Sequence, residues 1–428
     1  MIQRVTVSTI SPLLIVIALL LAGCDQTDPP TDAPTNPQLS EGEGFLSLTW
    51  DVVADRTYWV IYNEGTSVSL DDNDGILFDA EPPFFVDSLT NGTQYAVALT
   101  SSVGSSAVGP FAATQTGTPR FIDSSFPWTV STTLTAENLN ALTFLDDDYV
   151  VIGANGSVFI GAIDYPSTDP THGVVGVSAW STPTTLPTLT GIDLVSVITD
   201  GDKFIVLGQD GTVLISADED PTSWSLANAI VTTSNMNDIG FSGSLYFAVG
   251  DGGEIYTNNL ANLSANWELR NSGVTTDLNS VAFLGATYVI VGDAGVILTS
   301  SDAVNWTQRT SGTTEDLYDI TISLDDGIYA IVGDNGTILT SPDLIDWTPL
   351  TASAPTANLR DITYGIGDQF VILAENGEIA YSETGADGSW VVDSDIDNMG
   401  TVLPTMRALV SNRSYLAVGD NGTIISIR

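Results

Sequence analysis

The chain of 428 residues repeats one pattern seven times. Each copy begins with two apolar residues that flank a small or acidic residue, and a tight turn ending in glycine follows about 17 residues later. The copies begin at Leu139, Leu194, Met236, Leu278, Leu317, Leu359 and Met406, and their turn glycines are Gly156, Gly211, Gly253, Gly295, Gly336, Gly377 and Gly422. A repeat of about 40 residues built from short strands is typical of a β-propeller, so each copy is expected to form one blade.

The clearest copy, residues 277–312, contains four short strand-like segments. They are residues 278–283, 288–292, 296–300 and 306–309. Most copies turn at a dipeptide such as Asn335-Gly336, because both central residues of a type I′ turn need positive φ. Four strands per copy predict four-stranded blades.

The tryptophans predict how the ring of blades closes. Six copies carry a tryptophan after their turn glycine, namely Trp180, Trp224, Trp267, Trp306, Trp347 and Trp390. The seventh copy has none before Arg428, whereas Trp128 stands upstream with no turn of its own. We predict that residues 126–133 pair with residues 423–427 as the outer strand of the last blade. This closure leaves no open sheet edge between the first and last blades, and the propeller would span residues 125–428.

Two copies contain a further motif, Ser-x-Asp-x-x-x-Trp. Its residues are Ser300, Asp302 and Trp306 in one copy, and Ser341, Asp343 and Trp347 in the next. The motif resembles the Asp-box of BNR (sialidase-type) repeats. That resemblance implies a structural turn between the third and fourth strands of a blade, far from the binding face.

An arginine follows two of the tryptophans at the same spacing: Arg270 lies three residues after Trp267, and Arg309 three residues after Trp306. This spacing resembles the repeats of Ycf48/HCF136-like photosystem II assembly factors, whose arginine patch binds a partner protein. Arg270 and Arg309 are therefore one candidate binding pair.

The first 24 residues have the features of a bacterial lipoprotein signal peptide. Arg4 precedes an apolar segment, residues 13–20, which is too short for a membrane-spanning helix of about 20 residues. Leu21-Ala22-Gly23-Cys24 then resembles a lipobox, and Cys24 is the only cysteine. A lipid on Cys24 would anchor the protein in the cell envelope, at the periplasmic face or the cell surface. The alternative is an ordinary secretory signal.

Residues 25–36 are polar with three prolines, and we predict a disordered tether.

Residues 37–118 predict a separate β-sandwich. Leu46, Leu48 and Trp50 alternate with polar residues, and Tyr58, Val60 and Tyr62 occupy alternate positions of a second apolar segment. The segment resembles a fibronectin type III domain, in which Trp50 matches the core tryptophan and Leu89 with Tyr95 match the tyrosine corner. The predicted fold class is therefore all-β, a fibronectin type III-like β-sandwich followed by a seven-bladed β-propeller.

Charge and composition limit the functions that the chain can have. It carries 53 acidic against 10 basic side chains, a net charge of −43, which excludes nucleic acid as a partner. With one histidine, His172, and one cysteine, a zinc site of His and Cys ligands is not possible. We predict no catalytic residue, metal or cofactor. Calcium stays an alternative at 71–75 or 146–148, the densest acidic clusters, which otherwise are solvated loops.

The candidate ligand-binding position is the second residue of each copy. It is Asn140, Val195, Asn237, Asn279, Tyr318, Arg360 and Arg407 in turn. We expect it at the start of each innermost strand, on the usual binding face of propellers. Arg360 and Arg407 would sit on neighbouring blades and bind an anionic group. Alternatively, each pairs with a local carboxylate such as Asp361 or Asp420.

These observations favour a non-catalytic, lipid-anchored scaffold that binds an envelope protein or polysaccharide through the propeller face. The alternative is a surface glycoside hydrolase of the sialidase-like propeller type, although the characteristic Arg-Ile-Pro is absent. A hydrolase requires two convergent carboxylates in the central mouth, and the scaffold predicts none.

Overall fold

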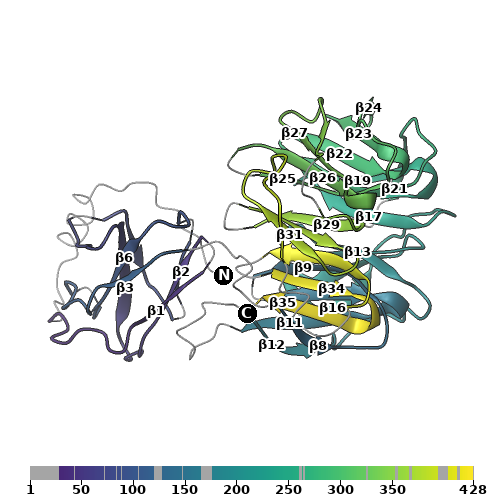
Figure 1. The fold of residues 1–428 in the computed structure, drawn as a ribbon. Helices are drawn as coiled ribbons and strands as arrows, with labels where there is room; N and C mark the ends of the chain where they lie inside the picture. Colours follow the sequence, from purple (N-terminus) through teal and green to yellow (C-terminus); the bar gives the residue numbers. More distant parts are fainter. Residues whose placement is uncertain are drawn as a thin grey trace. The chain divides into compact units, whose positions relative to one another are not determined.

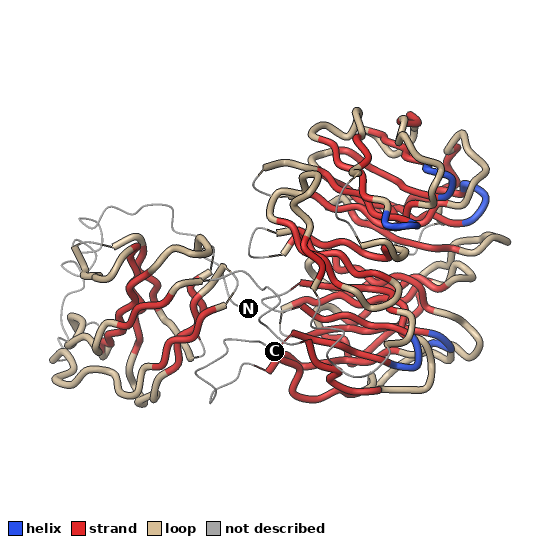
Figure 2. The backbone as a smooth tube through the Cα atoms, in the orientation of Figure 1, coloured by secondary structure: helices blue, strands red, loops and turns tan. Residues whose placement is uncertain are grey.

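The computed structural model describes residues 28–427 except 43, 72, 83, 88, 105, 120–127, 147, 165–175, 260–262, 264–265, 324–325, 352–354, 366–368, 394–402 and 412–414. The chain divides into two compact units, Met1–Phe121 with Tyr165–Gly173, and Ile122–Asp164 with Val174–Arg428. Strands dominate both units, and the helices drawn in Figure 2 are short turns. Across the described residues, no helix is long and apolar enough to cross a membrane.

The N-terminal unit is a sandwich of two antiparallel sheets (Figure 1). One has the order β1 (Gln38–Glu41), β2 (Leu46–Thr49), β5 (Phe84–Val86); the other has the order β4 (Gly75–Phe78), β3 (Thr57–Glu64), β6 (Tyr95–Ser102), β7 (Gln115–Gly117). The alternating residues that predicted strands, among them Leu46, Val60 and Leu99, form one buried core. Trp50 packs in this core against Tyr58, with ring centroids 5.3 Å apart.

Residues 30–36, which belong to the segment predicted as a tether, contact the N-terminal unit in the structure. Arg56 forms an ion pair with Asp32 at 2.9 Å, and the amide of Asp51 donates to the carbonyl of Thr35 at 3.1 Å. Pro30 and Pro34 are buried. Residues 25–27 lie outside the described part.

The second unit consists of seven four-stranded antiparallel sheets, numbered here as blades 1 to 7 (Figure 1). The innermost strands are β9 (Leu139–Leu145), β13 (Leu194–Thr199), β17 (Met236–Phe241), β21 (Leu278–Leu284), β25 (Leu317–Ile322), β29 (Leu359–Tyr364) and β33 (Met406–Ser411). The second strands are β10 (Asp148–Gly153), β14 (Phe204–Gly208), β18 (Leu245–Gly250), β22 (Thr287–Gly292), β26 (Tyr329–Gly333), β30 (Phe370–Ala374) and β34 (Tyr415–Gly419). These strands are almost wholly apolar because both of their faces pack against neighbouring blades.

The two outer positions of each blade complete the sheets. The third strands are β11 (Val158–Asp164), β15 (Val213–Ala217), β19 (Glu254–Asn259), β23 (Val296–Ser300), β27 (Ile338–Ser341), β31 (Ile379–Ser382) and β35 (Thr423–Ile427). The outer strands are β12 (Gly176–Ser181), β16 (Asp220–Leu226), β20 (Glu268–Asn271), β24 (Thr307–Arg309), β28 (Thr348–Pro349), β32 (Val391–Val392) and β8 (Trp128–Thr133). β8 is the first strand of this unit in sequence, yet it is the outer strand of blade 7.

Blade 7 therefore combines both ends of the repeat region. β8 pairs antiparallel with β35 in a register that runs from Thr423↔Thr133 to Ile427↔Trp128. The Trp128 indole N–H donates to the Tyr381 hydroxyl of blade 6 at 2.8 Å. A further bond, from the amide of Asn421 to Asn138 Oδ1 at 3.2 Å, links the turn of blade 7 to blade 1.

The glycine turns connect the second and third strands. Five have two consecutive residues with positive φ, as a type I′ turn requires: η1 (Ala154–Gly156), η2 (Asp251–Gly253), η4 (Asp293–Gly295), η5 (Asp334–Gly336) and η7 (Asp420–Gly422). In η5, φ is 53° at Asn335 and 69° at Gly336. A Cβ on Gly336 would lie 2.0 Å from the Pro355 carbonyl oxygen, so only glycine fits. In blades 2 and 6 the glycine alone has positive φ.

Candidate functional site

The innermost strands surround a central cavity of about 470 Å³. The second residue of every repeat lines it: Asn140, Val195, Asn237, Asn279, Tyr318, Arg360 and Arg407. The seven positions that vary within the constant repeat are thus brought together in space.

A β-bulge at the start of each innermost strand places these side chains. In blade 5, Leu317 faces Gly333 and Asp319 faces Val332, so Tyr318 is the extra residue. The same shift occurs in the other six blades. Since a bulge re-aims the local side chains, both the second and the third residue of the repeat reach the cavity lining.

Both cavity arginines are bound by carboxylates of their own blades. Arg360 Nη2 lies 2.5 Å from Glu375 Oε2, and its guanidinium stacks 4.1 Å from the ring centroid of Tyr318. Arg407 Nε lies 2.6 Å from Asp420 Oδ1. The hydrogen bond from Arg360 lowers the pKa of Glu375. Local pairing therefore describes both arginines, although the partner of Arg360 is Glu375 and not Asp361.

Two of the three asparagines at the same position also bind an acid of their own turn, whereas Asn140 donates to the Leu194 carbonyl of the next blade. Asn237 and Asn279 donate to the turn carboxylates of their own blades, Asp251 at 3.0 Å and Asp293 at 2.9 Å. Each also donates to a backbone carbonyl of the next blade. Burial raises the pKa of Asp293, and nearby carboxylates add to the effect. In four blades, those of Asn237, Asn279, Arg360 and Arg407, the second residue of the repeat is thus paired with an acid of its own turn.

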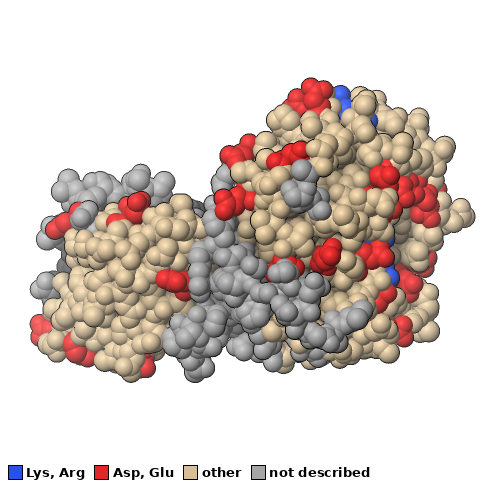
Figure 3. Space-filling model, in the orientation of Figure 1, with Lys and Arg blue, Asp and Glu red and all other residues tan. Residues whose placement is uncertain are grey.

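Around this rim the charge is mainly negative. Asp251, Asp277 and Asp316 all raise the pKa of Asp293 through space, in addition to its burial, which is the larger cause. Figure 3 shows the same imbalance over the visible face, where acidic side chains are frequent and basic ones few. An anionic ligand would find little uncompensated positive charge here.

The third residue of the repeat forms a second layer in the cavity, which the sequence analysis did not select as a site. It is Ala141, Ser196, Asp238, Ser280, Asp319, Asp361 and Ala408. Ser196 Oγ donates to Asp238 at 2.6 Å, and Ser280 Oγ donates to Asp319 at 3.2 Å. The sequence pattern does contain a small or acidic residue at this position. Its role could not be predicted from the pattern, because its hydrogen-bond partner lies on the next blade.

Each of the three aspartates also accepts a backbone N–H from the following blade. Asp238 accepts from Val281 at 2.9 Å, Asp319 from Ile362 at 3.0 Å and Asp361 from Leu409 at 2.9 Å. The innermost strands of neighbouring blades share no ladder, so these bonds link adjacent sheets directly.

Asp319 and Asp361, on the innermost strands of blades 5 and 6, line the same cavity and influence each other's pKa. Burial raises the pKa of Asp238 to about 6 and that of Asp361 to about 6. Burial and the adjacent Asp361 raise the pKa of Asp319 further. Glycosidases hold their two carboxyl groups about 5 to 9.5 Å apart, with a substrate or water between them. The carboxyl groups of Asp238, Asp319 and Asp361 all line the central cavity, so the structure contains the convergent carboxylates that the scaffold hypothesis did not predict and that the hydrolase alternative requires.

The second candidate pair lies on the outer strands and is not equivalent in its two blades. Arg270 forms an ion pair with Glu268 at 2.5 Å. Arg309 donates from Nε to Thr299 Oγ1 at 2.8 Å and, among the described residues, forms no ion pair. Its guanidinium therefore keeps unused donors.

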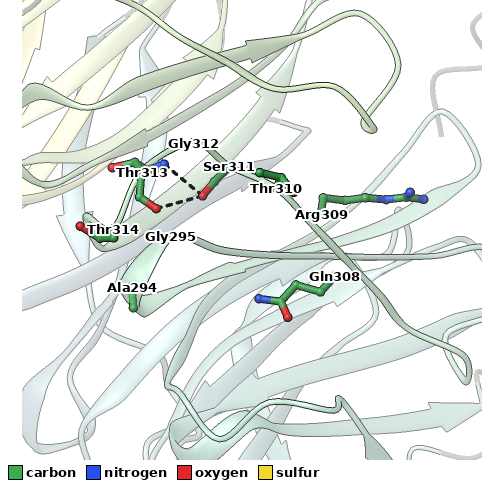
Figure 4. A pocket seen from close by; sticks show the side chains of 9 residues that line it. All are labelled: Ala294, Gly295, Gln308, Arg309, Thr310, Ser311, Gly312, Thr313 and Thr314. Atoms are coloured by element: carbon green, nitrogen blue, oxygen red, sulfur yellow. Dashed lines mark hydrogen bonds between the residues drawn. The ribbon is translucent and has the colours of Figure 1, made fainter.

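Arg309 borders a polar groove of about 780 Å³ between the turn of blade 4 and the loop that leads to blade 5. The lining is Ala294, Gly295, Gln308, Arg309, Thr310, Ser311, Gly312, Thr313 and Thr314. In Figure 4 the Arg309 side chain extends away from the Ser311–Thr313 loop. Hydrogen bonds between Ser311 and Thr313 stabilise this loop. Gln308 and the loop hydroxyls supply further donors and acceptors beside it.

The residues of the Ser-x-Asp-x-x-x-Trp motif stabilise the loops between the third and fourth strands of blades 4 and 5. Asp302 Oδ1 accepts the amides of Val304 and Asn305 at 2.9 and 2.8 Å, and the Asn305 amide lowers the pKa of Asp302. In the next blade Asp343 accepts the amides two and three residues ahead, while Ser341 bonds to it from the strand end. Trp306 and Trp347 pack in the cores between blades.

The other sequence candidates give no site in the described structure. Cys24 and His172 lie outside the described residues. In the 71–75 loop, Asp74 accepts the Glu64 amide at 2.6 Å, which uses one carboxylate oxygen. Within the described ranges, no group of three or more His, Cys, Asp or Glu residues could hold a metal ion.

Comparison with known proteins supports the fold. A family model described as the DUF6242 beta propeller domain matches residues 264–418. No curated protein matches the sequence. The protein is therefore an all-β protein with a β-propeller domain.

Solved structures with the same fold are distant in sequence. YCF48 bound to D1 peptide is 16% identical, with a TM-score of 0.55 over 70% of this chain and 96% of that one. YCF48 from Cyanidioschyzon merolae is 15% identical, with a TM-score of 0.52 over 71% and 98%. The WD40 beta propeller domain of Doa1 is 11% identical, with a TM-score of 0.54 over 71% and 97%.

Proposed function

We propose that this protein is a non-catalytic scaffold of the bacterial cell envelope, anchored by a lipid on Cys24, whose propeller binds a protein partner. In this proposal, a fibronectin type III-type domain separates the membrane from a seven-bladed propeller. The sheet orders β1-β2-β5 and β4-β3-β6-β7 and the bond from the Thr90 amide to the Tyr95 hydroxyl support that assignment of the spacer. Repeats of the BNR type account for the two Asp-box loops.

One observation carries the proposal: each cavity arginine forms an ion pair with a carboxylate of its own blade, whereas Arg309, whose charge helps to lower the pKa of Asp343, forms no ion pair within the described residues. Arg360 and Arg407 are engaged by Glu375 and Asp420. Arg309 borders a polar groove with donors to spare. A guanidinium without a carboxylate partner binds carboxylates by paired, charge-assisted hydrogen bonds. We therefore assign partner binding to the Arg309 groove ahead of the cavity mouth, and YCF48 with its bound peptide supports a protein partner.

The test uses the soluble chain from Asp25 onward in an envelope pull-down and on a glycan array, with released sugar measured in parallel. We expect a retained envelope protein and no sugar release. Arg309→Ala should abolish retention, while the matched pair Arg360→Ala with Arg407→Ala should leave it intact. The reverse pattern would return the site to the cavity, and released sugar would favour the glycoside hydrolase.

The lipid anchor has a separate test. Cys24→Ala in the full chain should block incorporation of labelled fatty acid and move the protein from the membrane fraction to the soluble fraction. Unchanged membrane association would contradict anchoring through this residue, independently of what the propeller binds.

A further inference from the structure

Asparagine is a chemically labile residue, and it deamidates most readily before glycine, which has no side chain to shield its backbone nitrogen. The chain contains five such pairs, which begin at Asn91, Asn155, Asn335, Asn376 and Asn421. Deamidation starts when the glycine nitrogen attacks Cγ, the side-chain carbonyl carbon of the asparagine. Hydrogen bonds that hold either group therefore protect a pair, and these bonds differ among the five pairs.

Three of the pairs have the same backbone conformation. In the turns of blades 1, 5 and 7, φ is 54° at Asn155, 53° at Asn335 and 55° at Asn421, and ψ is 32°, 37° and 33°. All three asparagines are exposed. The last two also share the local sequence Asp-Asn-Gly-Thr, at residues 334–337 and 420–423. Backbone conformation, exposure and local sequence therefore give Asn335 and Asn421 no difference in reactivity.

A glutamate holds the asparagine side chain in two of these turns. Asn155 Nδ2 donates to Glu137 Oε2 at 2.9 Å, and Asn335 Nδ2 donates to Glu315 Oε2 at 2.5 Å. Each glutamate lies two residues before the innermost strand of its blade. Pro404 occupies that position in blade 7, and its side chain has no acceptor. Among the described residues, the side chain of the blade 7 asparagine forms no hydrogen bond, whereas its backbone amide does.

The glycine nitrogens differ in the same way. In four of the five pairs the glycine amide donates to a backbone carbonyl at 2.7 to 2.9 Å: Gly92 to Pro119, Gly156 to Ile192, Gly336 to Ala357 and Gly377 to Ala374. In the fifth pair, the Gly422 amide donates to no residue within the described part of the chain. Attack by a held nitrogen requires its hydrogen bond to break first, so the four held amides resist the reaction and Gly422 lacks that protection.

We propose that Asn421 is the site of spontaneous deamidation in the folded protein, because neither of its reacting groups is held. The Gly422 nitrogen forms a bond to Asn421 Cγ and the Cγ–Nδ2 bond breaks. The side-chain nitrogen leaves as ammonia and takes with it the proton of the glycine nitrogen. Water then opens the cyclic imide at one of its two carbonyls, which leaves either aspartate or isoaspartate.

The product acts on the junction between blades 7 and 1, where the Asn421 amide donates to Asn138 Oδ1 at 3.2 Å. A Cβ on Gly422 would lie 2.2 Å from the Thr135 carbonyl oxygen, so the junction has no room for a larger backbone. Isoaspartate lengthens the backbone by a methylene group at this point. Either product also adds a negative charge to a turn that already contains Asp420. Deamidation therefore weakens the contact that closes the ring.

The test follows deamidation of the folded full chain in mildly alkaline buffer, with each pair quantified by peptide mass spectrometry. We expect Asn421 to react at least about tenfold faster than Asn155 and Asn335, since two hydrogen bonds of ordinary net strength protect each of these internal controls. In chain denatured with urea, Asn335 and Asn421 should react at equal rates, because they share their local sequence. Equal rates in the folded chain would overturn the proposal, and so would a preference for Asn421 that persists in urea.

A second measurement tests the effect on the ring. Protein in which Asn421 has deamidated should unfold at a lower urea concentration than fresh protein, because the junction between blades 7 and 1 is weakened. Asn421→Gln keeps a neutral side-chain amide that reacts far more slowly, so this variant should keep its own unfolding midpoint through the same incubation. A loss of stability as large in this control would refute the assigned effect, and so would an unchanged midpoint after deamidation.

Discussion

The central cavity and the outer groove of the propeller treat their arginines in opposite ways. In the cavity, Arg360 and Arg407 form ion pairs with the turn acids of their own blades. At the outer groove, Arg309 bonds only to a threonine hydroxyl among the described residues. The comparison teaches that convergence of charged side chains does not identify a binding site, because their partners decide whether the charge is available.

The largest effect on stability is expected for Trp128, because its outer strand closes the ring of blades. Trp128 is 2% exposed and belongs to the core shared by blades 6 and 7. Trp128→Ala should lower the free energy of unfolding of the propeller by about 3–5 kcal/mol, measured by denaturant titration. Val130→Ala on the same strand, where the side chain is 43% exposed, should change it by less than about 0.5 kcal/mol. Equal effects would show that β8 is not part of the closed ring.

The next largest effect is expected for the cavity carboxylates. Asp361→Ala leaves the Leu409 amide without its acceptor and should reduce the unfolding free energy by about 1–3 kcal/mol when measured near about pH 5. Alanine itself fits the position, since Ala141 and Ala408 occupy it in blades 1 and 7. Asp361→Asn, which keeps an acceptor, is the matched control. A loss as large in the control would mean that hydrogen bonding is not the cause.

A smaller effect is expected for the ion pair of Arg360 and Glu375, since both side chains are partly exposed. A double-mutant cycle with Arg360→Ala and Glu375→Ala should give a coupling of about 0.2–1 kcal/mol at neutral pH. The arginine lowers the pKa of Glu375, so the coupling is present above the unfolded glutamate pKa of about 4.3 and disappears as pH falls through the lower folded value. Coupling that persists in strong acid would contradict this assignment.

The smallest effect on stability is expected at Arg309. Arg309→Ala removes one hydrogen bond to Thr299 and no described ion pair, so the unfolding free energy should change by less than about 0.5 kcal/mol. The same variant is expected to lose partner binding, and Gln308→Ala tests the neighbouring side chain of the groove. A strongly destabilised Arg309 variant would place this residue with the cavity arginines and remove the contrast.

Much of the architecture could be predicted because it depends on local patterns. Alternation in residues 46–50 and 58–62 marked core faces that the sandwich buries. The glycine turns predicted positive φ pairs, which five of them contain. The unaccompanied Trp128 predicted a closing strand, and β8 pairs with β35. The contacts of residues 30–36 could not be predicted, because composition does not reveal an ion pair such as Arg56 with Asp32.

The candidate site was less predictable. The sequence identified the second repeat position and named Asp420, which pairs with Arg407, but it did not name Glu375, which lies 15 residues from Arg360. The small or acidic third position was visible in the repeat, but its place in the cavity could not be predicted from the sequence. Asp319 and Asp361 come close only across a blade boundary.

The sequence by itself determined the all-β class, the repeat and the turns, because these depend on residues close together in the chain. Only the tertiary structure decided which charges are available. Electrostatic pairing depends on distance in space, and closing the ring brings each innermost strand beside the next. That packing commits Arg360 and Arg407 to internal partners, places Asp361 beside Asp319 so that it helps to raise the pKa of Asp319, and leaves Arg309 without an ion pair among the described residues.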